Sequence, residues 1–403
     1  MARGEEAALH PASVGAAREG AVTREEEGGR VHAGALARAR ERRAARGAQA
    51  AQEITARSTR AAAPARADTR PLGAVMLVLS LLLLAAVTVA LCVGRYEVPP
   101  AAAFQILAAQ VLPIDVSTWP DAMSDVVLKL RFPRVLAAIL VGGALALAGA
   151  VYQGIFKNPL VSPDLLGVSS GACVGAAVSI LLGLGLLSRQ VFAFAGGVIA
   201  VALAMLIPRL MRRDSTIMLV LSGVIVGGFM GSVIGLIKYV ADPETQLPDI
   251  VYWQLGSIAK VNMDAVAAVA PVMILTAAVL FAMRWRVNLL SLGDQDAKTL
   301  GVNLRRERGV AVACATVLTA CAVCLSGTIG WIGLVMPHVA RRLVGADNRR
   351  VLPVAAVLSA IFLLVIDTLA RTLSGGELPL GILTGFIGAP FFALILVKER
   401  MSE

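Results

Sequence analysis

Long apolar runs dominate the chain from residue 72 to residue 397, and short polar or Gly/Pro-containing links separate them. Residues 77–93 are apolar on every side, whereas a strand of an outer-membrane barrel alternates apolar and polar positions. A bilayer core of about 30 Å requires about 20 mostly apolar residues for each spanning helix. The pattern predicts an all-α integral membrane protein of about ten transmembrane helices, near residues 73–93, 133–153, 165–186, 191–210, 216–238, 265–284, 309–327, 329–344, 351–371 and 379–397.

Composition supports the same class. Apolar residues make up 57% of the 403 positions, charged residues only 16%, and the mean hydropathy is +0.77. The formal net charge of +10 does not indicate nucleic-acid binding, because the basic residues lie in the N-terminal tail and in the short links. With the N-terminus inside, the inner links and tail carry 29 basic residues and the outer links carry 8. This bias predicts that both termini are cytoplasmic.

The chain divides into two parts by composition. Residues 1–70 contain 13 arginines and 9 acidic residues with no aromatic residue, so they cannot bury enough apolar surface to fold. We expect a disordered, basic cytoplasmic tail, although residues 35–56 could instead form a basic helix on anionic lipid. Residues 71–403 form the expected transmembrane domain.

Residue types that usually carry chemistry are sparse. The five cysteines all lie inside apolar segments, including the C-x-x-C of Cys321 and Cys324, and are expected to be packing residues rather than metal ligands. No phosphate-binding loop of the G-x-x-x-x-G-K-[ST] type occurs, so the chain is not expected to hold ATP. Ser169 and His338 have no third orienting group in the sequence, and a role as an enzyme is not expected.

A stripe of glycines follows one face of the fifth expected span. Gly227, Gly231 and Gly235 recur at every fourth residue, a spacing that lets two helix backbones approach closely. Two alternatives stay open: close packing inside one subunit, or a face that lines a pore or contacts a second subunit.

Charged residues at membrane depth are costly and are usually functional. Asp367 and Arg371 lie four residues apart near the outer end of the ninth span and can pair along one helix face. Arg131 and Arg134 flank Pro133, which is expected to start the second span from the outside. These outward arginines contradict the orientation bias, so they are either membrane anchors or a cationic site for carboxylates.

The inner link of residues 287–308 is long enough to do more than turn. Ser291 and Asp294 could cap a short helix whose polar face looks away from the membrane. A soluble partner could bind there.

Several ordered motifs then resemble one family. The blocks begin with Arg131-Phe-Pro-Arg134 and end with Glu377-Leu-Pro-Leu-Gly381 followed by Gly388-Ala-Pro390. Between them lie residues 142–149, 152–160, 162–171, 293–301 and 327–338. Together they resemble the FecCD-type permeases, the membrane subunits of type II ABC importers for ferric siderophores, haem and vitamin B12. The resemblance covers about residues 73–400, and the 70-residue tail departs from it.

The resemblance implies ten helices, a dimer of permease subunits that is either a homodimer or a heterodimer, two cytoplasmic ABC ATPase subunits and an external substrate-binding protein. ATP and Mg would lie on the ATPase subunits, with no cofactor in this chain. It implies that Arg131, Arg134 and Arg371 receive carboxylates of the binding protein. ATPase coupling would fall on Ser291, Gly293, Asp294, Asp296, Leu300 and Gly301. The translocation path or dimer contact would use Gly227, Gly231, Gly235, Thr384, Gly388 and Pro390.

The expected function is therefore that of a multi-pass permease in the bacterial cytoplasmic membrane that moves an iron chelate, haem or a corrinoid with ATP hydrolysed by its partners. The alternative is an ion-coupled secondary transporter of a small solute. Such a transporter is expected to carry unpaired acidic residues near mid-membrane, whereas Asp367, the one deep carboxylate expected, has a neighbouring arginine.

Overall fold

A computed structural model describes residues 71–113, 115, 118–211, 216–292, 297, 299–301 and 303–400. The chain divides into two units, Met1–Asp68 and Thr69–Glu403, and all of these residues belong to the second. The expected tail of residues 1–70 lies outside the described residues, so its disorder stays a prediction.

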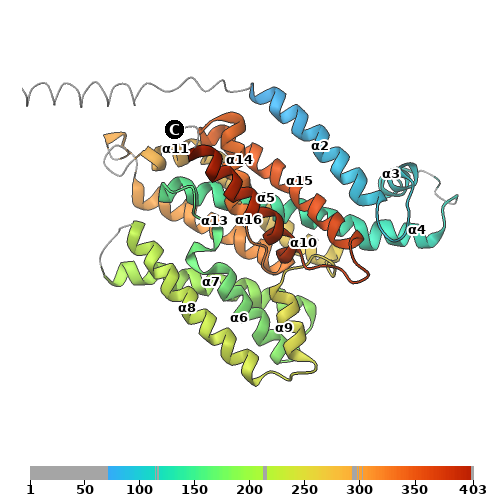
Figure 1. Cartoon of the computed structure of the whole chain (residues 1–403), viewed down its shortest axis with the longest axis horizontal. Helices are drawn as coiled ribbons and strands as arrows, with labels where there is room; N and C mark the ends of the chain where they lie inside the picture. Colours follow the sequence, from blue (N-terminus) through green and yellow to red (C-terminus); the bar gives the residue numbers. More distant parts are fainter. Residues whose placement is uncertain are drawn as a thin grey trace, which may run out of the picture. The chain divides into compact units, whose positions relative to one another are not determined.

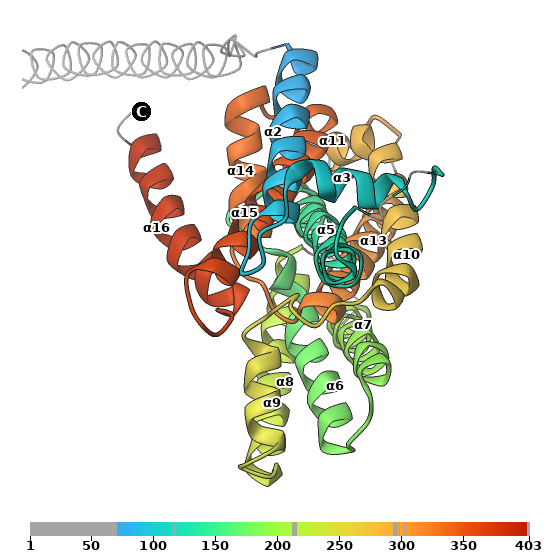
Figure 2. The same cartoon turned by 90° about the vertical axis from the view of Figure 1, so that its right-hand side faces the viewer.

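Helices make up the second unit (Figure 1, Figure 2), and the described residues form no strand. In chain order the elements are α2 (Leu72–Cys92), α3 (Pro100–Ala108), α4 (Asp121–Asp125), the π-helical segment η1 (Val126–Arg131), α5 (Phe132–Phe156), the 3₁₀ turn η2 (Pro163–Leu166), α6 (Val168–Leu181), α7 (Leu186–Leu210), α8 (Thr216–Val240), α9 (Gln246–Gln254), α10 (Met263–Ala282), α11 (Arg284–Leu292), α13 (Leu304–Ser326), α14 (Ile332–Val344), α15 (Asn348–Thr372) and α16 (Leu380–Arg400).

Each of the ten expected spans coincides with one helix: α2, α5, α6, α7, α8, α10, α13, α14, α15 and α16. In the described residues, seven helices are long and apolar enough to cross a membrane, and α6, α14 and α16 are not among them. The 13 residues of α14 extend only about 20 Å at 1.5 Å per residue, less than the bilayer core. The all-helical membrane fold is confirmed, and the number of crossings stays a prediction.

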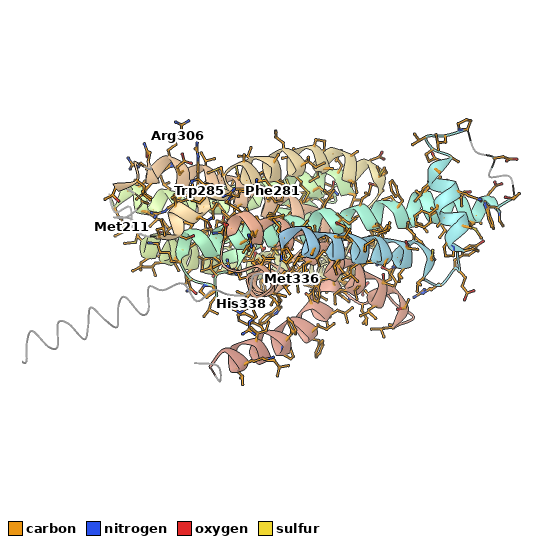
Figure 3. The ribbon with its side chains drawn as sticks, turned by 90° about the horizontal axis from the view of Figure 1, so that it is seen from above. Met211, Phe281, Trp285, Arg306, Met336 and His338 are labelled. Carbon is orange, nitrogen blue, oxygen red and sulfur yellow. The ribbon has the colours of Figure 1, made fainter. Side chains whose placement is uncertain are left out.

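The two ends of the helices carry different elements. Trp285 of α11, Arg306 of α13 and Met211 beyond α7 lie toward one end, away from α3 and α4, drawn in teal (Figure 3). We call these the α11 end and the α3–α4 end. Two short helices lie outside the ten expected spans: α3 at Pro100–Ala108 and α9 at Gln246–Gln254.

Three helices form the centre. The most apolar 18-residue windows of the α4–α5 run, α13 and α15 are 78%, 72% and 56% buried, against 17% for α2 and 22% for both α8 and α10. Glycines allow this packing: a Cβ on Gly142 would lie 2.7 Å from the carbonyl oxygen of Ser359, and one on Gly149 only 1.8 Å from that of Gly333. Helix association in lipid depends on such close backbone approach.

Pro133 lies in the first turn of α5, as expected, but no loop precedes this helix. The helical run extends from Asp121 to Phe156, and Pro133 follows the π turn of Val126–Arg131. Proline lacks the N–H of an ordinary i→i−4 bond, and its ring clashes with the preceding turn, so a wider π turn accommodates it inside the run.

Two links and the first turn of α16 meet at a glycine junction formed by Gly256, Gly327 and Gly381. Gly256 and Gly327 have φ of +74° and +65°, which favour glycine, and a Cβ on any of the three would lie within 2.5 Å of a backbone carbonyl oxygen. Backbone hydrogen bonds join Ser257 N to Ser326 O at 2.7 Å and Leu380 N to Gly256 O at 2.8 Å. The start of α16 is thereby fastened to the α9–α10 and α13–α14 links.

Candidate functional site

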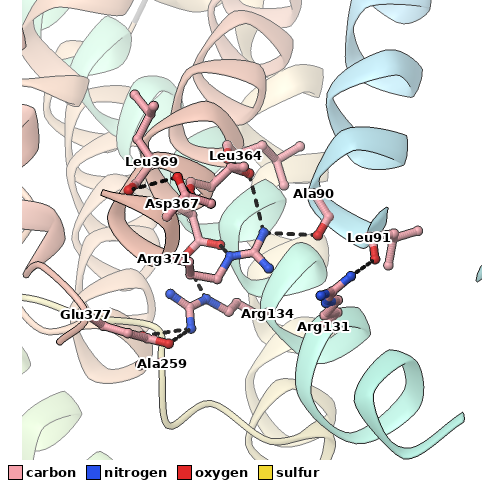
Figure 4. A network of polar contacts seen from close by, with 12 residues as sticks. Ala90, Leu91, Arg131, Arg134, Ala259, Leu364, Asp367, Leu369, Arg371 and Glu377 are labelled. Carbon is pink, nitrogen blue, oxygen red and sulfur yellow. Dashed lines mark hydrogen bonds and ion pairs between the residues drawn. The ribbon is translucent and has the colours of Figure 1, made fainter. Parts of the chain in front are cut away.

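A buried ion-pair network lies near the α3–α4 end, where α5 and α15 meet (Figure 4). Arg134 in the first turn of α5 donates from Nε to Asp367 Oδ1 at 2.7 Å and from Nη1 to Glu377 Oε2 at 2.8 Å. Asp367 comes from α15 and is 1% exposed, while Glu377 comes from the link to α16. One arginine therefore connects α5 with both sides of the α15–α16 turn.

Arg371 extends the network to α2. Its Nε lies 3.3 Å from Asp367 Oδ2, so the expected pair four residues apart on one helix face is confirmed. Its Nη2 donates to the carbonyl oxygen of Ala90 in α2 at 3.0 Å. Asp367 is thus shared between two arginines, an arrangement that compensates a carboxylate removed from water.

Arg131 closes the carboxyl end of α2. Its guanidinium donates to the carbonyl oxygens of Leu91, Cys92 and Tyr96, and the bond to Cys92 measures 2.8 Å. The last carbonyls of a helix have no partner within the helix, and they attract cations. Arg131 satisfies two of them and fixes the turn into the next link.

The three arginines are 5%, 7% and 9% exposed, and all three bond to other parts of this chain. Their geometry makes them clamps that hold α2, α5 and α15 together. The docking role expected for Arg131, Arg134 and Arg371 stays a prediction. Sequence reasoning missed Glu377 as their partner, although it lies in a quoted motif, because spacing alone does not show which link folds back onto the network.

The glycine stripe of α8 is uncovered. A Cβ built on Gly227, Gly231 or Gly235 would meet no atom within 4 Å. Within the described residues, close packing is seen only beside Gly227, where a Cβ on Gly167 would lie 3.4 Å from the Gly227 backbone nitrogen, and it is not seen at Gly231 or Gly235. A path or a subunit contact remains the prediction for this face.

The candidates on α16 divide into two groups. Thr384 is fully buried and donates to Gly381 O at 3.2 Å, and a Cβ on Gly388 would lie 2.7 Å from Cβ of Trp331. Both face their own subunit, whereas Pro390 is exposed. The open face instead carries Phe386, 74% exposed, which sequence reasoning did not select. The path or dimer role of the three predicted residues stays a prediction.

One carboxylate beside α8 was also missed. Asp164 in η2 is exposed and accepts a hydrogen bond from Ser169 Oγ. Its neighbour Leu165 contacts α8 so closely that a Cβ on Gly223 would lie 2.1 Å from the Leu165 carbonyl oxygen. Asp164 therefore sits next to the open face of α8, and the Ser162-Pro-Asp164 motif was the available signal.

The candidate coupling link follows α11 at the α11 end. Ser291 lies in the last turn of α11 and donates to Val287 O at 2.8 Å, so its expected role as a helix cap is wrong. Leu300 is 60% exposed, and a Cβ on Gly301 would meet nothing within 4 Å. Gly293, Asp294 and Asp296 lie outside the described residues. The coupling role stays a prediction for all six.

An ion pair joins the two helices that flank this link. Arg286 Nη1 lies 2.5 Å from Glu307 Oε1, joining α11 to the first turn of α13. The hydrogen bond to Glu307 and its negative charge raise the pKa of Arg286. The pair holds α11 and α13 together on both sides of the link.

The comparisons with known proteins decide the family. The model of the FecCD transport family matches residues 82–398. The chain belongs to this family. A molybdate import system permease protein of Haemophilus influenzae is 37% identical, covering 80% of this chain and 95% of the relative. A hemin transport system permease protein of Yersinia pestis is 40% identical, covering 70% and 85%.

A solved structure supports the fold. It is described as an inward-facing conformation of a transporter assigned to the metal-chelate ABC type. The TM-score is 0.73 at 36% identity, and the match covers 81% of this chain and 99% of the other. The chain is therefore a membrane permease of ABC-importer type, as the motifs predicted.

Proposed function

We propose that this chain is the membrane-spanning subunit of an ATP-driven importer that carries an iron chelate, haem or a corrinoid across the bacterial cytoplasmic membrane. Its partners are a second permease subunit, two cytoplasmic ABC ATPase subunits that bind ATP and Mg, and an external binding protein. The α11 end and both termini face the cytoplasm, and the α3–α4 end faces outward. The bias of basic residues toward the inner links supports this orientation.

The open small-residue face of α8 carries the proposal. Gly227, Gly231 and Gly235 leave a strip of backbone with no neighbour within 4 Å of a built Cβ, although such strips in membrane helices normally pack against another helix. A second subunit that covers part of this strip leaves a path between the two chains. Phe386 on the exposed face of α16 is a further candidate for the same surface.

Coupling follows from the contacts of α11. This helix packs against α5, α13 and α15, and the Arg286–Glu307 pair fastens it to α13. ATP-driven closure of the ATPase subunits would move the link that carries Leu300 and, through α11, tilt the three central helices. Alternating access requires only that the ATPase subunits, through this contact, stabilise one permease conformation when ATP is bound and the other when it is not.

Docking of the binding protein would use the α3–α4 end. Arg131, Arg134 and Arg371 supply three cations there, but Arg134 and Arg371 already share Asp367. A partner carboxylate would have to compete with that buried pair, or displace Glu377, whose side chain is 34% exposed, from Arg134. We propose the second route, in which the partner's carboxylate replaces that of Glu377 on Arg134.

Molybdate is a second candidate cargo. The permease of Haemophilus influenzae named for molybdate import is covered over 95% of its length by this chain. An oxyanion differs from a bulky chelate in size and charge, so direct uptake measurements separate the two.

Uptake by the purified complex tests the proposal. The tagged chain would be isolated from its own host with its bound ATPase subunits and binding protein, reconstituted in vesicles, and supplied with ATP on the cytoplasmic side. ATP-dependent uptake of a ferric siderophore, haem, a corrinoid or molybdate identifies the cargo. Uptake that continues without ATP but requires a proton or sodium gradient would show that the secondary-transporter alternative is correct.

A further inference from the structure

An arginine-lined hollow of about 260 Å³ lies at the α11 end, outside the candidate coupling, docking and path residues. It is formed where three elements converge: the start of α2, the start of α11 and the first turn of α15. Its lining consists of Leu72, Arg284, Asp347, Arg349 and Arg350. Three guanidinium groups therefore surround one carboxylate.

The carboxylate of Asp347 already accepts two hydrogen bonds. Asp347 Oδ1 accepts from Asn288 Nδ2 at 2.6 Å and from the backbone N–H of Arg349 at 2.9 Å, which caps α15. In the described part of the chain, no carboxylate lies within 4 Å of the guanidinium groups of Arg284 or Arg350. The hollow thus has an excess of positive charge, with donors suited to bidentate contact with phosphate.

Aromatic and apolar surface adjoins the hollow. The guanidinium of Arg349 lies 5.8 Å from the ring centroid of Trp285, which is 55% exposed. Exposed tryptophans are enriched at the level of lipid headgroups. Leu72 begins α2, and only 17% of the most apolar window of this helix is buried. Acyl chains can lie along this helix below a headgroup held by the arginines.

We propose that this hollow binds the phosphate headgroup of an anionic phospholipid from the leaflet at the α11 end. Basic pockets between membrane helices on the cytoplasmic side are suited to such headgroups. The largely unburied apolar surface of α2, which begins at the hollow, favours a lipid over an acidic segment of a protein partner, which would leave that apolar surface uncovered. The lipid would join α2, one of the least buried helices, to the central helix α15.

Lipid binding to the delipidated full-length chain tests the site. Arg284→Gln combined with Arg350→Gln removes two cations but leaves the Asp347 cap and the Arg349–Trp285 contact intact. Arg209→Gln combined with Arg306→Gln is the control, because it removes the same charge from exposed positions at the same end that do not line the hollow. The arginine-rich tail is present in all three proteins, so its contribution cancels.

Phosphatidylglycerol retention, counted by native mass spectrometry, and its effect on thermal unfolding are the two readouts. Each arginine near a membrane surface contributes roughly fivefold to binding of an anionic lipid, so the test variant should bind about 25-fold more weakly while the control stays near wild type. Equal losses in test and control variants would overturn the proposal. So would equal stabilisation by phosphatidylcholine or by inorganic phosphate. Unchanged lipid binding in the test variant, with loss of the co-purified ATPase subunits, would assign the hollow to a protein contact instead.

Discussion

Asp367→Asn tests whether the ion-pair network holds the helices together. The carboxylate is 1% exposed and lies 2.7 Å from Arg134 Nε and 3.3 Å from Arg371 Nε. Its neutralisation leaves two buried guanidinium groups without their shared counter-charge. Removal of one partner from a buried pair costs about 3–5 kcal/mol, so we expect a loss of this size in the free energy of unfolding.

Thermal unfolding of the purified protein in detergent or nanodiscs measures the effect. At roughly 2 °C per kcal/mol, the melting temperature should fall by about 6–10 °C. Asp125→Asn is the matched control, because its pair with Lys129 at 2.7 Å has 61% and 71% of the two side chains exposed. An exposed pair contributes at most about 1 kcal/mol, so the control should melt within about 2 °C of wild type.

A double variant separates charge imbalance from lost packing. Arg134 keeps its pair with Glu377 in Asp367→Asn, whereas Arg371 loses the carboxylate it contacts. Arg371→Met added to Asp367→Asn removes that unpaired cation and should recover part of the lost stability, since contacting residues couple. Equal melting temperatures for Asp367→Asn and Asp125→Asn would refute the clamp. Arg134 and Arg371 would then be free to act as docking residues.

Three further outcomes follow from the exposed and buried positions. Gly231→Leu should leave the melting temperature of the isolated chain within about 2 °C of wild type but reduce assembly or uptake. Gly149→Leu should prevent folding, because a Cβ there would lie 1.8 Å from Gly333 O. An unfolded Gly231→Leu chain would contradict the open face. In a cysteine-free background, Leu187→Cys and Glu244→Cys should react with an impermeant thiol reagent on intact cells, and Leu300→Cys should not. Labelling of Leu300→Cys would show that the proposed orientation in the membrane is wrong. Leu300→Asp should lower the affinity for the ATPase subunits about tenfold, as expected when one leucine is lost from an interface. Leu112, 55% exposed, lies at the other end, and Leu112→Asp should leave this affinity unchanged.

The helices themselves could be predicted from the sequence. Apolar runs of about 20 residues in lipid have one stable conformation, because every backbone N–H and C=O must be satisfied within the segment. All ten expected spans therefore fall on helices. The short helix α9 was missed, since Gln246–Gln254 is amphipathic and lies in a link, where the apolar-run criterion has no signal.

The candidate sites were harder to predict, because spacing gives the face of a helix but not what covers it. The regular stripe of Gly227, Gly231 and Gly235 is open, while the irregular set that includes Gly142 and Gly149 makes the close contacts. Likewise, the position of Arg131 near a helix end indicated a surface cation, but its side chain turns inward to the end of α2. Both differences depend on which helices become neighbours, and this is a tertiary property.

The glycine junction has a mechanical consequence. Gly256 and Gly327 lie in two links and Gly381 lies in the first turn of α16, far apart in the sequence, yet their backbones touch without side chains between them. A crossing of this kind acts as a pivot, because the start of α16 can turn about it but cannot slide away without breaking the bonds to both links. Any swing of α16 during transport therefore has its largest amplitude at the far end of the helix, at Leu394 and beyond. A larger residue at any one of the three positions would force the backbones apart, because its Cβ would lie within 2.5 Å of a carbonyl oxygen, and the pivot would be lost.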